Sequence, residues 1–134
     1  MLFIDTNIAI ALRDNDVDTR NRLSAMGRVP VISIMTRVEL ENGVTRDPQD
    51  ITVRMVRRTL LDRFLATIEV QYFLEDDVLC YGHIVLALGH DRRLTIHRLI
   101  AAQAITRNAS LITRNGKDFR TIDGLKLIEW GTPI

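Results

Sequence analysis

The chain has 134 residues, enough for one compact domain with its own apolar core, and we expect a single domain over residues 1–134. Apolar residues make up 46% and charged residues 26%, as is usual for globular proteins. The formal net charge of +1 gives the molecule no general attraction to nucleic acids or anionic membranes. No segment approaches the roughly 18 apolar residues of a membrane span. The single cysteine, Cys80, excludes an internal disulfide and fits a reducing cytoplasm.

Short apolar runs that alternate with helical patterns predict an α/β fold. Strands are expected at residues 2–5, 30–34, 69–73 and 110–113, with 125–128 as a fifth strand if the sheet extends that far. Helices are expected at residues 7–12, 19–26, 36–43, from Asp47-Pro48 to about 68, 76–88 and 97–107. This alternation favours a three-layer α/β/α arrangement with a central parallel sheet of four or five strands.

Polar side chains follow the predicted strands at the points where the strands end. Asp5 follows the first strand, Glu39 the second, and Asn115 and Asp118 the strand at 110–113. The carboxyl ends of parallel strands share one edge of a sheet, where open α/β folds place their chemistry. Three carboxylates close together require a compensating cation or bound protons. Because Mg²⁺ and Mn²⁺ prefer oxygen ligands and share phosphate oxygens with a substrate, the pattern indicates metal-assisted phosphodiester hydrolysis.

Each of these residues also has a purely structural alternative. Asp5 could cap the next helix, and Glu39 could complete a capping box with Thr36. Asn115 precedes a glycine and could belong to a simple turn, and Asp118 could be a solvated loop charge. Other catalytic sites lack their motifs: the chain has no glycine-rich phosphate loop, no G-x-S-x-G elbow and no H-x-x-x-H pair.

Taken in order, these segments resemble a PIN domain, and within that superfamily a VapC-type toxin of a bacterial toxin–antitoxin pair. The resemblance extends from Leu2 to Trp130. The matching segments are Ile4-Asp5-Thr6-Asn7, Val38-Glu39-Leu40, Leu99-Ile100-Ala101-Ala102-Gln103-Ala104, Leu111-Ile112-Thr113-Arg114-Asn115 with Asp118-Phe119, and Ile128-Glu129-Trp130.

The resemblance implies a Mg²⁺-dependent (or Mn²⁺-dependent) endoribonuclease in the bacterial cytoplasm that cuts structured RNA, often transfer RNA. It implies a cognate VapB-type antitoxin that blocks the site, and a homodimer. By position in the motifs, Asp5 and Glu39 match the first two acidic metal ligands. Asn115 and Asp118 match the fourth, more variable corner of the catalytic site.

His97 departs from the family pattern, which has Asp at this third metal-binding corner. A carboxylate in the first turn of a helix is favoured by the helix dipole and binds Mg²⁺ well, whereas neutral imidazole is a poor Mg²⁺ ligand. We therefore expect impaired activity. Three interpretations remain open: a substitution that disarms a toxic protein, a natural variant that prefers another metal, or a member that never relied on this corner.

Basic residues surround the predicted acidic pocket and could hold an RNA backbone while the metal meets the scissile phosphate. They are Arg92, Arg93, Arg98, Arg114 and Lys117, with Arg120 nearby. A solvated basic rim is the structural alternative. The same alternative is favoured for Arg54, Arg57 and Arg58 on the long helix, and Trp130 is expected to be a packing anchor.

Two other functions would use the same fold. A non-catalytic PIN-like protein could sequester an antitoxin or RNA without turnover. A phosphatase could use Asp5, but many such enzymes have a second Asp two residues later, where this chain has Asn7.

Overall fold

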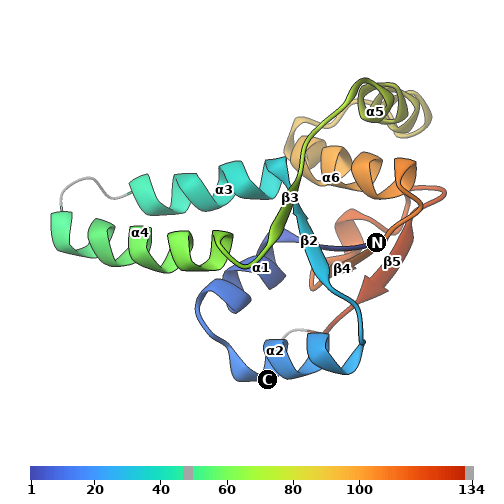
Figure 1. Ribbon diagram of the computed structural model, residues 1–134. Coiled ribbons are helices and arrows are strands. Elements are labelled where there is room, and N and C mark those ends of the chain that lie inside the picture. The colour runs from blue at the N-terminus through green and yellow to red at the C-terminus, as the bar shows by residue number, and fades with distance from the viewer. Residues whose placement is uncertain (47–49, 132–134) are drawn as a thin grey trace.

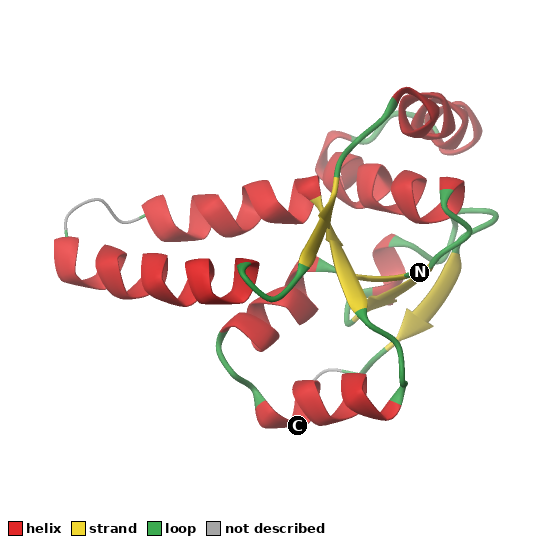
Figure 2. Ribbon diagram, in the orientation of Figure 1, coloured by secondary structure: helices red, strands yellow, loops and turns green. Residues whose placement is uncertain are grey.

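The computed structural model describes residues 1–46 and 50–131 (Figures 1 and 2). Strands and helices alternate along these residues in the order β1 (Leu2–Ile4), α1 (Thr6–Arg13), α2 (Val17–Ala25), β2 (Pro30–Ser33), α3 (Ile34–Thr45), α4 (Ile51–Leu65), β3 (Glu69–Gln71), α5 (Glu75–Leu88), α6 (Thr95–Thr106), β4 (Ser110–Thr113) and β5 (Lys126–Glu129). Short 3₁₀ turns lie at Arg92–Leu94 and Gly116–Asp118. None of the helices in the described ranges has the length and apolar character needed to cross a membrane.

All neighbouring strands of the central sheet pair in parallel, in the order β3-β2-β1-β4-β5. The predicted parallel sheet is confirmed, and Lys126–Glu129 supplies its fifth strand. The chain moves outward from β1 through β2 to β3, then returns to the other side of β1 with β4. Strand order therefore reverses beside β1, and such a switch point opens a crevice at the carboxyl ends of the strands.

Apolar side chains alternate between the two faces of the sheet, as the period of two in a strand requires. On β1, Leu2 and Ile4 join the core beneath α1 to α4, whereas Phe3 joins the core beneath α5 and α6. Figure 1 shows helices on both sides of the sheet, so the three-layer prediction holds. Trp130 is buried in the first core, with the guanidinium of Arg22 4.1 Å from its ring centroid, and is thus the expected packing anchor.

Several predicted helix starts are displaced because local caps decide them. Helix α2 begins at Val17, since the Asp16 carboxylate accepts hydrogen bonds from the Thr19 backbone and hydroxyl. Helix α3 begins at Ile34, two residues before the expected start, because the Ser33 hydroxyl accepts from the Met35 N–H at 2.9 Å. The predicted start at Asp47-Pro48 lies outside the described residues, and α4 is capped by Asp50.

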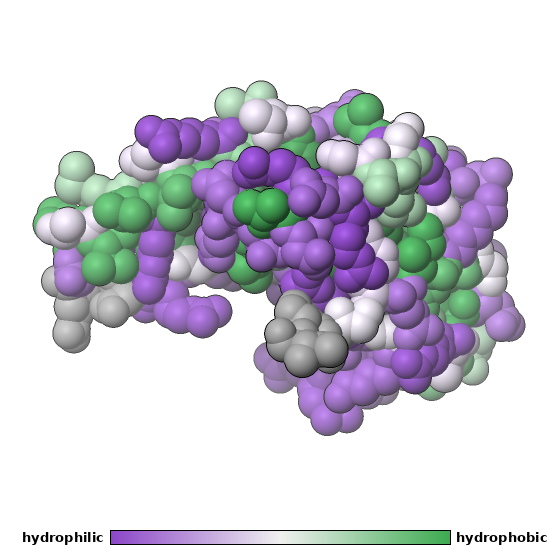
Figure 3. Space-filling view, turned by 90° about the horizontal axis from the view of Figure 1, so that it is seen from below, coloured by the Kyte–Doolittle hydropathy of each residue, from purple (hydrophilic) through white to green (hydrophobic). Residues whose placement is uncertain are grey.

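Helices α3 and α4 form an arm that projects from the sheet (Figure 1). The arm is pinned by Arg58 on α4, whose guanidinium donates two hydrogen bonds to the Glu41 carboxylate on α3. These bonds lower the pKa of Glu41 to about 2. Arg58 is therefore engaged between helices, while 39% of its side chain stays exposed. Figure 3 shows apolar side chains along this arm and hydrophilic ones over the middle of that face.

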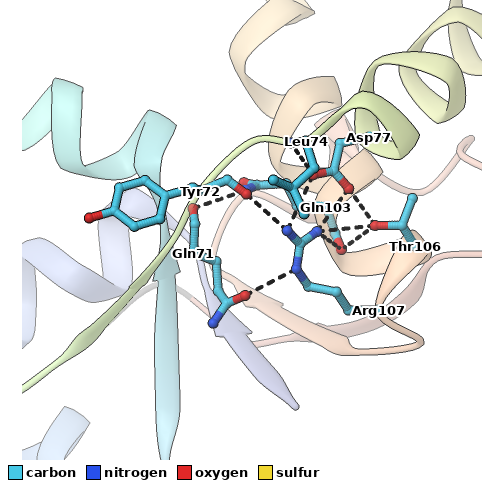
Figure 4. Close-up of polar contacts among 7 residues, drawn as sticks. All are labelled: Gln71, Tyr72, Leu74, Asp77, Gln103, Thr106 and Arg107. Atoms are coloured by element: carbon cyan, nitrogen blue, oxygen red, sulfur yellow. Dashed lines mark hydrogen bonds and ion pairs between the residues drawn. The ribbon is translucent and has the colours of Figure 1, made fainter.

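A buried polar network fixes α6 against α5 and β3 (Figure 4). At its centre, the Arg107 guanidinium donates to the Asp77 carboxylate at 2.8 Å and to the Tyr72 carbonyl at 2.9 Å. The Gln103 amide, on the same helix, donates to the Gln71 carbonyl at 3.0 Å. Burial of Asp77 by itself raises its pKa, but hydrogen bonds from Arg107, Thr106 and the Leu74 N–H outweigh burial and lower it.

We predict that Asp77→Asn lowers the free energy of unfolding by about 3 kcal/mol at pH 7, because it leaves the Arg107 charge without its partner. A lowered pKa means that the Asp77 carboxylate stabilises the fold above its ordinary value of 3.8, and that this contribution disappears as the pH falls through the folded value. Urea unfolding of both proteins across pH should show their difference shrinking in acid.

Arg120→Gln is the matched control, because it breaks the exposed ion pair between Arg120 and Glu129. It should have a much smaller effect than Asp77→Asn. If the two variants lose the same free energy of unfolding, Asp77 does not stabilise the fold as the partner of the Arg107 charge.

Candidate active site at the carboxyl edge of the sheet

Asp5 stands directly after β1 at the switch point, and its carboxylate is almost completely buried, with 2% of the residue exposed. The Thr6 N–H donates to Asp5 Oδ1 at 2.8 Å, so Asp5 also caps α1 as the structural alternative foresaw. The Thr113 hydroxyl, at the end of β4, donates to Asp5 Oδ2 at 2.7 Å. A buried charge needs such donors, and here they fix both oxygens of the carboxylate.

Glu39 is brought to Asp5 by a single threonine. The Thr6 hydroxyl donates to Glu39 Oε1 at 2.5 Å, while the backbone N–H of the same residue holds Asp5. The Thr36 hydroxyl lies 3.1 Å from that of Thr6. Because α3 starts at Ile34, Thr36 lies within the helix and faces Thr6, so the alternative of a capping box with Glu39 was wrong.

The third and fourth predicted corners form a second group. His97 lies in the first turn of α6, as expected, with its Nε2 3.5 Å from Asp118 Oδ2. The Asn115 amide donates to the same Asp118 oxygen. The His97 ring meets Phe119 edge-on with centroids 5.1 Å apart, and its Nδ1 is buried without a hydrogen-bond partner among the described residues.

Thr113 connects the two groups. Its hydroxyl donates to Asp5 and accepts the Asn115 N–H at 2.9 Å, and the Asn7 amide lies 3.5 Å from it. The predicted site residues therefore gather at one edge of the sheet as Asp5 with Glu39, and His97 with Asn115 and Asp118. Sequence reasoning gave no role to Thr6 or Thr113, although both lie inside the quoted motifs, and it gave Thr36 only a capping role.

The two groups also differ in the metal ligands that they offer. Within residues 1–46 and 50–131, no group of three or more His, Cys, Asp or Glu side chains lies close enough to hold a metal ion. The Asp5–Glu39 pair is nevertheless a suitable donor set for a hard cation, because Mg²⁺ commonly takes one or two carboxylates and completes its shell with water and phosphate oxygens. The imidazole of His97 is instead directed at Asp118.

The predicted RNA-binding residues have different surroundings. Arg92, Arg93 and Lys117 are exposed. Arg114 is half-buried and donates to the Thr19 hydroxyl at 2.9 Å. Arg98 is only 5% exposed and donates to the Gly89 carbonyl at 2.6 Å, so its structural position corrects the expectation that it faces RNA.

A family model for the PIN domain matches residues 2–125. The chain belongs to the PIN-domain family. Ribonuclease VapC1 of Rickettsia felis is 35% identical over 130 residues, which cover 95% of this chain and 94% of the relative. Ribonuclease VapC2 of the same organism is 31% identical and covers 95% of this chain and 96% of the relative.

A solved structure of a VapC-type complex has a similar fold. The crystal structure of VapBC2 from Rickettsia felis bound to a DNA fragment from its promoter matches with a TM-score of 0.82 and 27% identity, covering 97% of this chain and 99% of that one. The PIN fold and the resemblance to VapC-type proteins are thus confirmed.

We predict that Thr113→Val lowers the free energy of unfolding of this PIN domain by about 1–3 kcal/mol, because it removes a donor from the buried Asp5 carboxylate and an acceptor from the Asn115 N–H. Urea denaturation at pH 7 measures the loss. Thr59→Val is the matched control, since Thr59 is exposed on α4 and its hydroxyl donates to the Met55 carbonyl one turn earlier. Equal stability of the two variants would contradict a role for Thr113 in holding the site.

Proposed function

We propose that this chain is the endoribonuclease toxin of a VapBC-type toxin–antitoxin pair, and that His97 impairs its activity. The observation that supports this most is the pairing of Asp5 with Glu39 through Thr6 at the switch point of a PIN sheet. The relatives named ribonuclease VapC support the reaction class. The proposed substrate is structured RNA, transfer RNA first.

The proposed mechanism assigns a task to each corner of the site. Asp5 and Glu39 would hold a divalent cation, Mg²⁺ or Mn²⁺, which when bound supplies a nucleophilic water and stabilises charge at the scissile phosphorus. Thr6 and Thr113 orient the two carboxylates, because the Thr6 N–H and the Thr113 hydroxyl hold Asp5 and the Thr6 hydroxyl holds Glu39. Asn115 fixes Asp118, and exposed Lys117 lies beside them to attract the RNA backbone.

His97 weakens this machinery for a physical reason. At the start of α6 a carboxylate would gain from the helix dipole and add a third oxygen ligand. The imidazole supplies no carboxylate oxygen, and it lies against Asp118, which it draws toward an ion pair when protonated. The site thus keeps two carboxylates on one side and, on the other, the Asp118 carboxylate in contact with an imidazole.

The proposed partners follow from the solved relatives. One is VapBC2 bound to promoter DNA, and another is VapBC-1 from nontypeable Haemophilus influenzae, with 27% identity and a TM-score of 0.79. By this likeness we assign the chain a VapB-type antitoxin partner. The homodimeric state and the bacterial cytoplasm are proposed from the family resemblance of the sequence alone.

The test is cleavage of bulk transfer RNA by this chain and by His97→Asp, side by side, in Mg²⁺ and then in Mn²⁺. We expect His97→Asp to cut at least tenfold faster, because it restores the third carboxylate. Adding Asp5→Asn or a chelator to His97→Asp should abolish cleavage.

His97→Asn is the matched control, since it removes the imidazole without adding a charge. If His97→Asp stays inert with both metals, the toxin assignment fails. If the parent chain cuts as fast as His97→Asp, the impairment by His97 is refuted while the nuclease assignment stands.

A non-catalytic binding protein is the second candidate, and the contact between His97 and Asp118 is the observation that favours it. That contact occupies the third corner with a pair that needs no metal. Tight binding of an antitoxin or RNA without turnover, persisting in His97→Asp, would select this function.

A further inference from the structure

A small basic pocket lies beside Glu39, outside the groups described above. It opens between α1, α3 and α4, with a volume of about 230 Å³. Three arginines line it: Arg13 from the end of α1, Arg46 from the end of α3, and Arg57 from α4. Glu39 forms part of the same wall, so the pocket and the proposed active site share one residue.

The positive charge of this pocket is only partly neutralised. The Arg13 side chain donates two hydrogen bonds to the Asp14 carboxylate, from Nε at 3.0 Å and from Nη2 at 3.3 Å. Its Nη1 lies over Gly43, 3.8 Å from where a Cβ would stand, so the missing side chain leaves that end of the guanidinium uncovered. In the described part of the chain, Arg46 and Arg57 have no acidic group within ion-pair distance, and Glu39 is bonded to Thr6 instead.

Arg58, the neighbour of Arg57, shows by contrast what an arginine with a carboxylate partner looks like on the same helix. Arg58 is held by Glu41, which pins the arm, and Arg37 contacts the same carboxylate at 3.0 Å. Arg57 lies one residue earlier, on the side of α4 that faces Glu39, and no such carboxylate meets it among the described residues. Arg13 and Arg57 are half-buried and Arg46 is exposed. Arginines that line one hollow without counter-charges are typical of an anion site, because each guanidinium presents a planar fork that matches phosphate oxygens.

We propose that Arg13, Arg46 and Arg57 bind a phosphate of the RNA backbone next to the scissile one. This inference rests on the proposed ribonuclease function and deepens it. The pocket has room for several water molecules, each about 30 Å³, so a phosphate with part of its ribose fits. Glu39 sets the direction: an RNA strand with one phosphate at Asp5 and Glu39 continues past Glu39 into the arginines.

A phosphate accounts for the pocket better than an acidic protein segment does. The guanidiniums come from three different helices and converge on one small hollow, which suits a compact tetrahedral anion. A shared wall with Glu39 also keeps the bound anion close to the reacting bond. This assigns a substrate-binding role to Arg57, for which the sequence favoured only a solvated face.

The experiment measures binding of bulk transfer RNA by filter retention as a function of salt. Each lost phosphate contact should reduce the slope of log K against log[salt] by about 0.7–0.9. Because the three arginines share one phosphate, we expect Arg57→Gln to lower the slope by part of one such step and Arg46→Gln/Arg57→Gln by about one. Arg57→Lys should retain most of the slope, because it keeps the charge. Lys126→Gln is the matched control on the exposed β5 strand and should bind as the parent does.

The same substitutions in the His97→Asp background separate this proposal from the proposed function. There we expect a KM for RNA raised at least fivefold with little change in kcat, and thermal unfolding unchanged. If His97→Asp cuts RNA while the double substitution leaves the slope and KM unchanged, the phosphate pocket is refuted and the ribonuclease stands. If the double substitution spares RNA but abolishes binding of a polyglutamate peptide, the pocket is for protein carboxylates and our proposal is wrong. RNA neither bound nor cut by any form would refute both.

Discussion

The buried carboxylate of Asp5 is the constraint on which the rest of the site depends. A charge with 2% exposure is costly unless hydrogen-bond donors surround it, and two donors here come from different parts of the chain. The Thr113 hydroxyl reaches Asp5 only because Ile4 of β1 pairs with Ile112 of β4. Thr6, placed next to Asp5 in the chain, then uses its hydroxyl to hold Glu39. Satisfying one charge therefore fixes the register of the central strands and the position of a second carboxylate.

The second group of site residues, His97, Asn115 and Asp118, does not surround a buried charge. Its members contact one another directly beside the sheet edge. Asn115 and Asp118 are three residues apart around a 3₁₀ turn, and His97 reaches them from the start of α6. The Phe119 ring supports the imidazole from its edge. Among the described residues, the Thr113 hydroxyl joins this group to Asp5. A change at position 97 can therefore alter the third corner without disturbing the two carboxylates.

The strands and the gathering of Asp5, Glu39, Asn115 and Asp118 could be predicted, because short continuous apolar runs that alternate with helical patterns are local and general signals of a parallel sheet. The start of α3 could not, since the Ser33 hydroxyl cap competes with strand continuation at Ile34 and sequence alone weights them alike. The roles of Thr6 and Thr113 and the burial of Arg98 depend on partners far apart in the chain or on a loop carbonyl. The sequence also cannot tell which arginine pairs with a carboxylate and which is free to bind a ligand. Arg58 pairs with Glu41, whereas we propose that Arg57 binds a ligand.

The way α6 is held decides how His97 should be interpreted. The far end of this helix is fixed by Arg107 on Asp77 and Tyr72, its middle by Gln103 on Gln71, and its first turn by Arg98 on the Gly89 carbonyl. None of these contacts involves the side chain at 97. The helix therefore presents that position to the crevice in the same place whichever residue stands there, because the backbone is anchored on both sides of it. An exchange of His for Asp at 97 changes the chemistry of the third corner while the scaffold stays in place, so a difference in activity between the two forms reports on ligand chemistry.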